Sequence, residues 1–112
     1  MSRHWVATVR HDLVRAGVAG GFTEADDGGD TRLRRLDRGD GLVLYSPREA
    51  ADVRRPLQCL TALGAVADDE PHRDAGTGRW RRRVDFETVR PVPIRPLLPL
   101  LGYLRERGVM PA

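Results

Sequence analysis

The segment Gly39–Pro47, with the sequence GDGLVLYSP, constrains the fold of this chain more than any other segment. Its Gly-Asp-Gly triplet is typical of a turn that reverses the chain. The Leu-Val-Leu triplet that follows is apolar at every position, which predicts a strand covered on both faces. Because proline has no backbone donor, we expect this strand to end before Pro47. Tyr45 and Ser46 are therefore predicted at the rim of a sheet, where an aromatic face and a hydroxyl can meet a ligand.

Three further segments have the patterns of strands. Arg3–Val9 and Trp80–Val89 alternate in side-chain character, whereas Leu57–Val66 is apolar on both faces and is expected at the centre of a sheet. Gly64 in that central strand indicates a bulge or a close backbone approach. Several strands, short helices and no βαβ rhythm predict an α+β fold: a small mixed, largely antiparallel sheet that curls into an open β-barrel with short flanking helices. A length of 112 residues predicts one domain over 1–112.

Between the strands we expect short helices and irregular segments. His11–Ala16 is predicted as a helical turn that ends at Gly17. The glycine-rich and acidic stretch 17–31 is predicted as a long loop, ordered at its start and mobile over Glu24–Asp30. Pro91 and Pro93 are expected to prevent regular strand pairing, and Leu97–Leu101 is expected to form about one turn of helix.

The composition excludes several classes of chemistry. All 19 basic residues are arginine, so mechanisms that need a lysine nucleophile, base or Schiff base are not available. The net charge of +3 permits an anionic partner without requiring one. Cys59 is the single cysteine, which excludes a disulfide framework within the chain and is typical of a small buried residue.

We expect neither a metal, a cofactor nor a catalytic centre. His4, His11 and His72 lie in different predicted elements, without a carboxylate or nucleophile at a recognised spacing. No apolar run is long enough to span a membrane, and the first five residues do not resemble a signal peptide. These observations predict a non-enzymatic cytoplasmic protein with no membrane partner.

The order and spacing of several motifs resemble the EVE domain across nearly the whole chain. EVE domains belong to the PUA-like superfamily, together with YTH and ASCH domains. The resemblance implies a PUA-like pseudo-barrel with a pocket that receives a single modified nucleobase turned out of its strand. Some ASCH-type relatives hydrolyse modified nucleosides with a lysine-centred set, which this lysine-free chain cannot use. The motifs that carry the resemblance are Trp5-Val6-Ala7, Gly17–Phe22, Gly39-Asp40 with Tyr45-Ser46-Pro47, Pro56-Leu57-Gln58, Arg82–Phe86 and Val92–Leu97.

The chain departs from the EVE pattern in two places. Ala19 stands where many relatives carry an aromatic residue, often Trp, so one wall of an aromatic pocket is either missing or supplied by Phe22. Relatives usually continue past the leucine-rich segment with a further strand and helix. The resemblance therefore implies a sheet without its closing strand, an edge that a second copy could cover, and a monomer or a homodimer.

A pocket for a flipped base needs flat faces for stacking and a few hydrogen-bonding groups. Trp5 and Tyr45 would lie at the same end of the sheet if the first two strands were antiparallel neighbours. The alternative is that Trp5 is a core residue and Tyr45 an ordinary buried phenol. With the resemblance, the complete set of predicted base-binding residues is Trp5, Gly17, Val18, Ala19, Gly20, Gly21, Phe22, Tyr45, Ser46, Pro47 and Arg82.

Other members of this set also have alternatives. Ser46 could donate to a base, or satisfy its own backbone before proline. The glycines could let backbone amides approach a ligand, or form a plain loop. Arg82 interrupts the apolar face of its strand, so it is expected to contact a phosphate or base edge, or to pair with a carboxylate such as Asp40 or Asp68.

Five arginines are predicted to follow the phosphates of a nucleic acid: Arg34, Arg35, Arg38, Arg81 and Arg83. For the last two, the alternative is solvated ion pairs with Asp85 and Glu87 on the same strand.

Together these features predict a non-enzymatic module that binds nucleic acid and recognises a modified base, by family analogy a modified cytosine in DNA. The alternative is an RNA-binding accessory protein with little base selectivity and a steep salt dependence. A third alternative is a small enzyme that acts on a free nucleotide or nucleoside.

Overall fold

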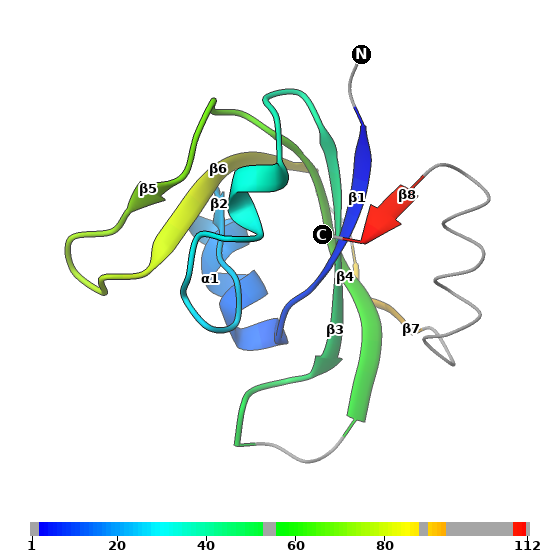
Figure 1. Ribbon diagram of the computed structural model, residues 1–112. Helices are drawn as coiled ribbons and strands as arrows, with labels where there is room; N and C mark the ends of the chain where they lie inside the picture. Colours follow the sequence, from blue (N-terminus) through cyan, green and yellow to red (C-terminus); the bar gives the residue numbers. More distant parts are fainter. Residues whose placement is uncertain (1–2, 53–55, 88–89, 94–108, 112) are drawn as a thin grey trace.

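A curved, open sheet forms the body of the protein, in a computed structural model that describes residues 3–52, 56–87, 90–93 and 109–111 (Figure 1). Its strands are β1 (His4–Thr8), β2 (Phe22–Thr23), β3 (Gly41–Arg48), β4 (Pro56–Val66), β5 (His72–Arg73), β6 (Trp80–Glu87), β7 (Val92–Pro93) and β8 (Val109–Pro111). The strand order is β2-β6-β4-β3-β1-β8, with β5 paired to β6 and β7 paired to β4. Among the described residues, one helix, α1 (His11–Gly20), and one 3₁₀ turn, η1 (Leu33–Arg35), accompany the sheet.

The sheet is mixed and open, and its four longest strands match the four predicted strands. The antiparallel pairing that would have placed Trp5 and Tyr45 at the same end of the sheet is not observed, because β1 runs parallel to β3 and to β8. A parallel pair needs a long crossover. The chain supplies one, since α1, β2 and η1 all lie between β1 and β3 in sequence. The other pairs among the described strands are antiparallel.

Two prolines lie inside strands, where breaks were predicted. β3 continues through Pro47 to Arg48, and its register with β4 shifts at that point, so the missing N–H falls at an irregularity of the ladder. Pro93 pairs with Cys59 in the two-residue strand β7. The predicted helix over Leu97–Leu101 lies outside the described residues.

The helix α1 is longer than predicted and includes Gly17, which was expected to end it. The left-handed residue at its C-terminus is Gly21, at φ 75°, whose N–H donates to the Gly17 carbonyl. Gly17 is instead needed for close packing, because a Cβ there would lie 2.2 Å from the Phe22 carbonyl oxygen. The start of the predicted loop is therefore wrong: helix α1 runs directly into β2, and the irregular segment begins only after Thr23.

The segment expected to be mobile is anchored at its first residue. The Glu24 carboxylate is buried, and its two oxygens accept hydrogen bonds from Arg79 at 2.8 Å and Arg81 at 2.6 Å. Because both arginines lie on or beside β6, Glu24 ties the chain after β2 to the sheet.

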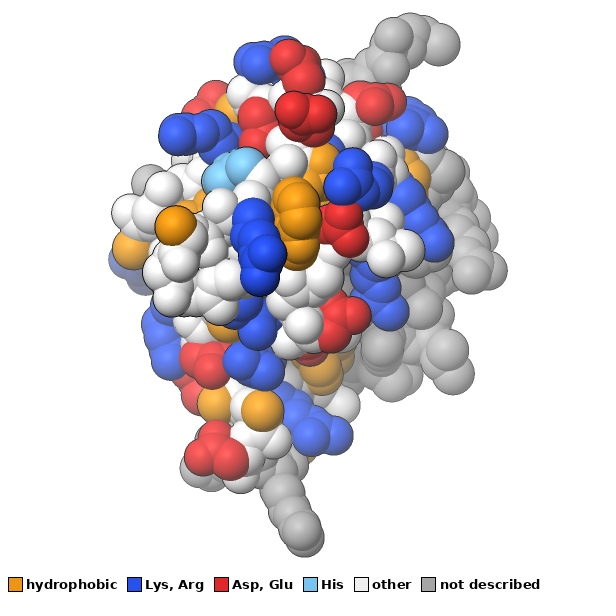
Figure 2. All heavy atoms as spheres, turned by 60° about the vertical axis from the view of Figure 1, so that its left-hand side comes forward, with side chains coloured by type: hydrophobic (Ala, Val, Ile, Leu, Met, Phe, Trp, Pro, Cys, Tyr) orange, Lys and Arg blue, Asp and Glu red, His pale blue; other side chains and the backbone are white. Residues whose placement is uncertain are grey.

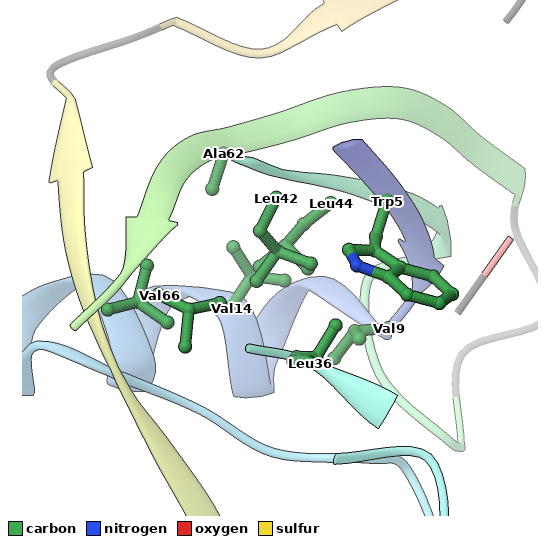
Figure 3. Close-up of a cluster of buried hydrophobic side chains, with 9 residues drawn as sticks. Trp5, Val9, Val14, Leu36, Leu42, Leu44, Ala62 and Val66 are labelled. Carbon is green, nitrogen blue, oxygen red and sulfur yellow. The ribbon is translucent and has the colours of Figure 1, made fainter. Parts of the chain in front are cut away.

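The hydrophobic core lies between the curved sheet and α1 (Figure 3). Trp5 is part of it, and its indole N–H donates to Asp40 Oδ2 at 2.8 Å. The alternative that Trp5 is a core residue is therefore confirmed. Within the described residues, no helix is long and apolar enough to cross a membrane. The core cluster comprises Trp5, Val9, Val14, Leu36, Leu42, Leu44, Ala62, Val66 and Val84.

Candidate functional site

A cavity of about 630 Å³ opens between the C-terminal half of α1 and the strands β4 and β6. Ligand pockets for small organic molecules have volumes of roughly 300–1,000 Å³, so the cavity has room for one. Its lining residues are Val18, Ala19, Gly20, Gly21, Thr61, Val84, Asp85, Phe86 and Glu87.

Thr61 reaches this cavity because it is the extra residue of a β-bulge. On β3, Leu44 pairs with Ala62 while the next residue, Tyr45, pairs with Leu60, so Thr61 has no partner in the ladder. Bulges re-aim side chains and are frequent beside functional sites. The bulge therefore places a hydroxyl among the cavity-lining residues.

The Thr61 hydroxyl has a defined orientation. Ser46 Oγ donates to the Val9 carbonyl oxygen at 2.7 Å, and Ser46 Oγ and Thr61 Oγ1 are also 2.7 Å apart. Since Ser46 has one hydroxyl proton, Thr61 must be the donor in the second bond. The Leu44 carbonyl, 3.4 Å from Thr61 Oγ1, is too far for a good bond. Thr61 Oγ1 is then left with acceptor capacity at the cavity.

The cavity also contains an open stretch of the edge of β6. Val84 N–H donates to the Gly21 carbonyl on this edge, whereas the Arg83 carbonyl accepts from Ala67 N–H on the β4 side. Alternate residues of a strand direct their backbone groups to the same edge. The N–H and C=O of Phe86 therefore point toward the cavity, and β2 pairs no further along the described β6 than Arg83. A ligand can use this donor and this acceptor.

The polar side chains of the cavity lining are acceptors or carry negative charge. Asp85 and Glu87 are exposed on β6, and none of the described lining residues is an arginine or histidine. Phe86 is the aromatic residue of the described lining. The cavity suits a flat, amino-bearing group better than it suits a phosphate.

A second hollow of about 380 Å³ adjoins the first and shares Val18, Ala19 and Thr61 with it. His11 and Arg15 also line it. His11 Nδ1 lies 2.9 Å from Glu49 Oε2, and Arg15 forms an ion pair with the same carboxylate. Burial, and then the positive charge of Arg15, lower the pKa of His11, so its imidazole is neutral at pH 7.

The structure does not bring Trp5 and Tyr45 together at one rim. In the parallel register, Trp5 pairs with Leu42 and Tyr45 pairs with Thr8. Their exposed fractions are only 6% and 1%, and neither residue lines the cavity. Burial raises the pKa of Tyr45, as expected for a phenol removed from water.

Arg82 is fully buried, and the alternative of a carboxylate partner is confirmed. Its Nε donates to Asp68 Oδ1 at 2.6 Å and its Nη2 to the Asp68 carbonyl at 2.8 Å. Its Nη1 donates to the carbonyl oxygens of Leu33 and Leu36. Arg82 thus joins β6 to η1 and to the segment after β4, and its guanidinium does not face the cavity.

Of the predicted glycine-rich segment, Val18, Ala19, Gly20 and Gly21 line the cavity, as the last residues of α1 and its cap. The Phe22 ring lies elsewhere, 3.7 Å from the Arg81 guanidinium carbon, and is absent from the cavity lining. Ser46 lies one hydrogen bond behind the cavity, at Thr61. Pro47 is half-buried and also outside the lining.

Three of the five predicted phosphate-binding arginines form ion pairs within the chain. Arg38 lies 2.8 Å from its carboxylate partner, and Arg34 and Arg81 lie 2.6 Å from theirs. The alternative that Arg81 pairs along its own strand is wrong, because the carboxylate comes from the chain after β2. The partners of Arg34, Arg38 and Arg81 are Asp30, Asp69 and Glu24.

Arg35 and Arg83 are exposed, and no carboxylate among the described residues pairs with their side chains. Figure 2 shows the face that carries the β5–β6 hairpin, where positive and negative side chains are interspersed. This face is therefore not a continuous basic surface.

Two features of the site were missed from the sequence. No carboxylate stands at a recognised spacing from His11 in the sequence, but the structure brings Glu49, from the segment after β3, within 2.9 Å of His11 Nδ1. Thr61 was not singled out, although it is the hydroxyl residue inside the apolar run 57–66. Within the described residues, no group of three or more potential metal ligands converges.

The chain is similar to bacterial proteins named UPF0310. A relative from Mycobacterium avium is 45% identical, over 94% of this chain and 78% of the relative. One from Mycolicibacterium gilvum is 44% identical, over 94% of this chain and 77% of the relative. One from Streptococcus mutans is 37% identical, over 84% of this chain and 72% of the relative. No protein-family model matches the chain.

Proposed function

The chain belongs to the UPF0310 family, and we propose that it is a non-enzymatic module that binds nucleic acid and recognises a modified nucleobase, a modified cytosine in DNA, in the cavity between α1 and β6. The observation that carries the proposal is this cavity, with its room for one small ligand and its acceptor-rich lining. Recognition of a base out of its stack requires such a pocket.

The acceptors of the cavity favour a base with an amino group. Carboxylates such as Asp85 and Glu87 can accept from the N4 amino group of cytosine. Thr61 Oγ1 adds a neutral acceptor, and the backbone of Phe86 adds one donor and one acceptor. Together these groups match the mixed hydrogen-bonding edge of a base.

The proposed fold family is the EVE domain of the PUA-like superfamily. The ordered motifs along the chain support it, and so does the curved, open sheet with one short helix on its inner side. The placement of Val18–Gly21 at the cavity supports the ligand role that the resemblance implies for this segment.

The phosphates on either side of the flipped base would lie outside the acidic cavity. Arg83 on β6 directly precedes the cavity-lining residue Val84 and has no carboxylate partner among the described residues. It is the best candidate among the five predicted arginines. The interspersed positive and negative side chains on the face of the β5–β6 hairpin (Figure 2) argue against the alternative of binding driven by arginine alone.

The test is a fluorescence anisotropy titration at fixed salt. It uses single-stranded and duplex oligonucleotides that carry cytosine, 5-methylcytosine or 5-hydroxymethylcytosine at one position. We expect a modified strand to bind at least tenfold more tightly than its unmodified counterpart, a difference of about 1.4 kcal/mol. Equal affinity for all of these strands would refute the proposal.

Variants assign the binding of the base to the cavity. Thr61→Val removes the hydroxyl at nearly constant volume, and Asp85→Asn removes one carboxylate charge. Either should weaken the binding of the modified strand by roughly five- to tenfold, as expected for the loss of one hydrogen bond of about 1 kcal/mol. Thr31→Val, at an exposed position away from the cavity, is the matched control and should change nothing.

A further inference from the structure

The two hollows lie side by side along α1, and we refer to the pair as the groove. Val18, Ala19 and Thr61 line both of them. The first hollow has negative side chains, whereas the second contains the Arg15 guanidinium. A ligand that fills both would therefore meet acceptors at one end and a cation at the other.

Arg15 keeps donor capacity for a ligand. Its side chain is 56% exposed, and its Nη1 donates to Glu49 Oε1. A guanidinium has five N–H groups, so the contact with Glu49 leaves several of them free. The planar fork of an arginine matches the oxygens of a phosphate.

Glu49 and His11 hold Arg15 at the groove. The carboxylate of Glu49 bridges His11 Nδ1, at 2.9 Å, and the guanidinium of Arg15. Because His11 is neutral and Glu49 balances Arg15, the cluster has little net charge in the absence of a ligand. An incoming phosphate would accept from the Arg15 N–H groups that Glu49 leaves free, and it would lie away from the carboxylates Asp85 and Glu87 of the first hollow.

We propose that the second hollow is the phosphate subsite for the nucleotide whose base enters the first hollow, with Arg15 as the phosphate ligand and with His11 and Glu49 as positioning residues. This inference rests on the proposed function of the first hollow. It makes the recognised unit a nucleotide within a strand, and it places one backbone phosphate on the α1 side of the groove.

The test replaces single phosphates by neutral methylphosphonates, immediately 5′ or immediately 3′ of the modified cytosine. For the wild-type protein, one of these two replacements should weaken binding at least fivefold. The Arg15→Met variant should bind the phosphodiester strand about as weakly as the wild type binds the methylphosphonate strand. The methylphosphonate should not weaken the binding of this variant any further. Arg32→Met, an exposed arginine outside the groove, is the control and should retain the full methylphosphonate effect.

The outcomes distinguish the two proposals. If modified and unmodified phosphodiester strands bind equally well, the proposed function fails. The phosphate subsite is refuted, while base recognition stands, if the modified strand is preferred but neither methylphosphonate weakens binding. It is also refuted if the affinity of Arg15→Met still falls fivefold on methylphosphonate replacement. Circular dichroism of Arg15→Met, which alters an exposed side chain, checks that the variant is folded.

Discussion

Replacement of the buried Arg82 by methionine should destabilise the protein far more than the same replacement at its exposed neighbour Arg83. The Arg82 guanidinium is fully buried and donates to Asp68 and to two backbone carbonyls of the η1 region. Methionine fills a similar apolar volume but satisfies none of these acceptors. Breaking a buried ion pair by removal of one partner costs about 3–5 kcal/mol.

The lower end of that range applies here, because the Asp68 side chain is 16% exposed and can regain some hydration. We therefore expect the free energy of unfolding to fall by about 3 kcal/mol. With a urea m-value of about 1.5 kcal/mol/M, typical for a small domain, the unfolding midpoint moves down by about 2 M. Arg83→Met should stay within about 0.5 kcal/mol of the wild type, as exposed substitutions usually do.

Urea denaturation of both variants, followed by circular dichroism, measures these shifts. Arg82→Met combined with Asp68→Asn should lose less stability than the sum of the two single variants, because each single change leaves the other group without its partner. A loss for Arg82→Met that does not exceed that of Arg83→Met by at least 1 kcal/mol would refute the structural role assigned to this arginine.

Two more predictions concern stability. Gly17→Ala should lower the free energy of unfolding by about 1–3 kcal/mol, because the new methyl group meets the Phe22 carbonyl. This loss exceeds the gain from the better helix propensity of alanine. Gly76→Ala, with room around it, is the control in the same denaturation experiment. Asp40 is pushed toward a higher pKa by burial, but the hydrogen bonds from two backbone amides and the Trp5 indole outweigh burial and lower its pKa. The stability linked to Asp40 is therefore present above the unfolded pKa of about 4, and it is lost as the pH falls through the lower pKa of the folded state. Between pH 5 and pH 3, the Asp40→Asn variant should then lose less stability than the wild type. An equal loss in both proteins would contradict this assignment.

The strands were predictable because their side-chain patterns are local. The alternation in Trp80–Glu87 and the apolar runs of β3 and β4 depend only on neighbouring residues, and the structure confirms them. Gly64 was correctly expected at a close backbone approach, since a Cβ there would lie 2.6 Å from the Asp85 carbonyl oxygen.

The direction of pairing was not predictable from the same patterns. An apolar strand has the same sequence whether its neighbour is parallel or antiparallel, and the crossover through α1 makes β1 and β3 parallel. This parallel pairing separates Trp5 from Tyr45, and neither residue lies at the candidate site. Pro47 was misjudged for a related reason, because a shift in register lets a strand continue past a residue without an N–H.

The candidate site was predictable only in part. The segment Val18–Gly21 was identified by resemblance, and it does line the cavity. The contribution of Thr61 depends on a bulge, that is, on how two strands align, which neither strand encodes alone. The partnership of His11 with Glu49 likewise joins residues 38 positions apart.

The glycines of α1 have a consequence for motion as well as for packing. A glycine inside a helix costs about 1 kcal/mol relative to alanine, and α1 carries both Gly17 and Gly20 within ten residues. Its last turns therefore depend on packing against Phe22. A Cβ at Gly17 would meet the Phe22 carbonyl oxygen, and a Cβ at Gly20 would meet the Phe22 ring. Segments of this kind open locally at a lower free energy than central strands. The amide hydrogens of Val18–Gly20 should thus exchange with solvent faster than those of β4, and a ligand seated against them would slow that exchange, so this side of the groove would become ordered as the site fills.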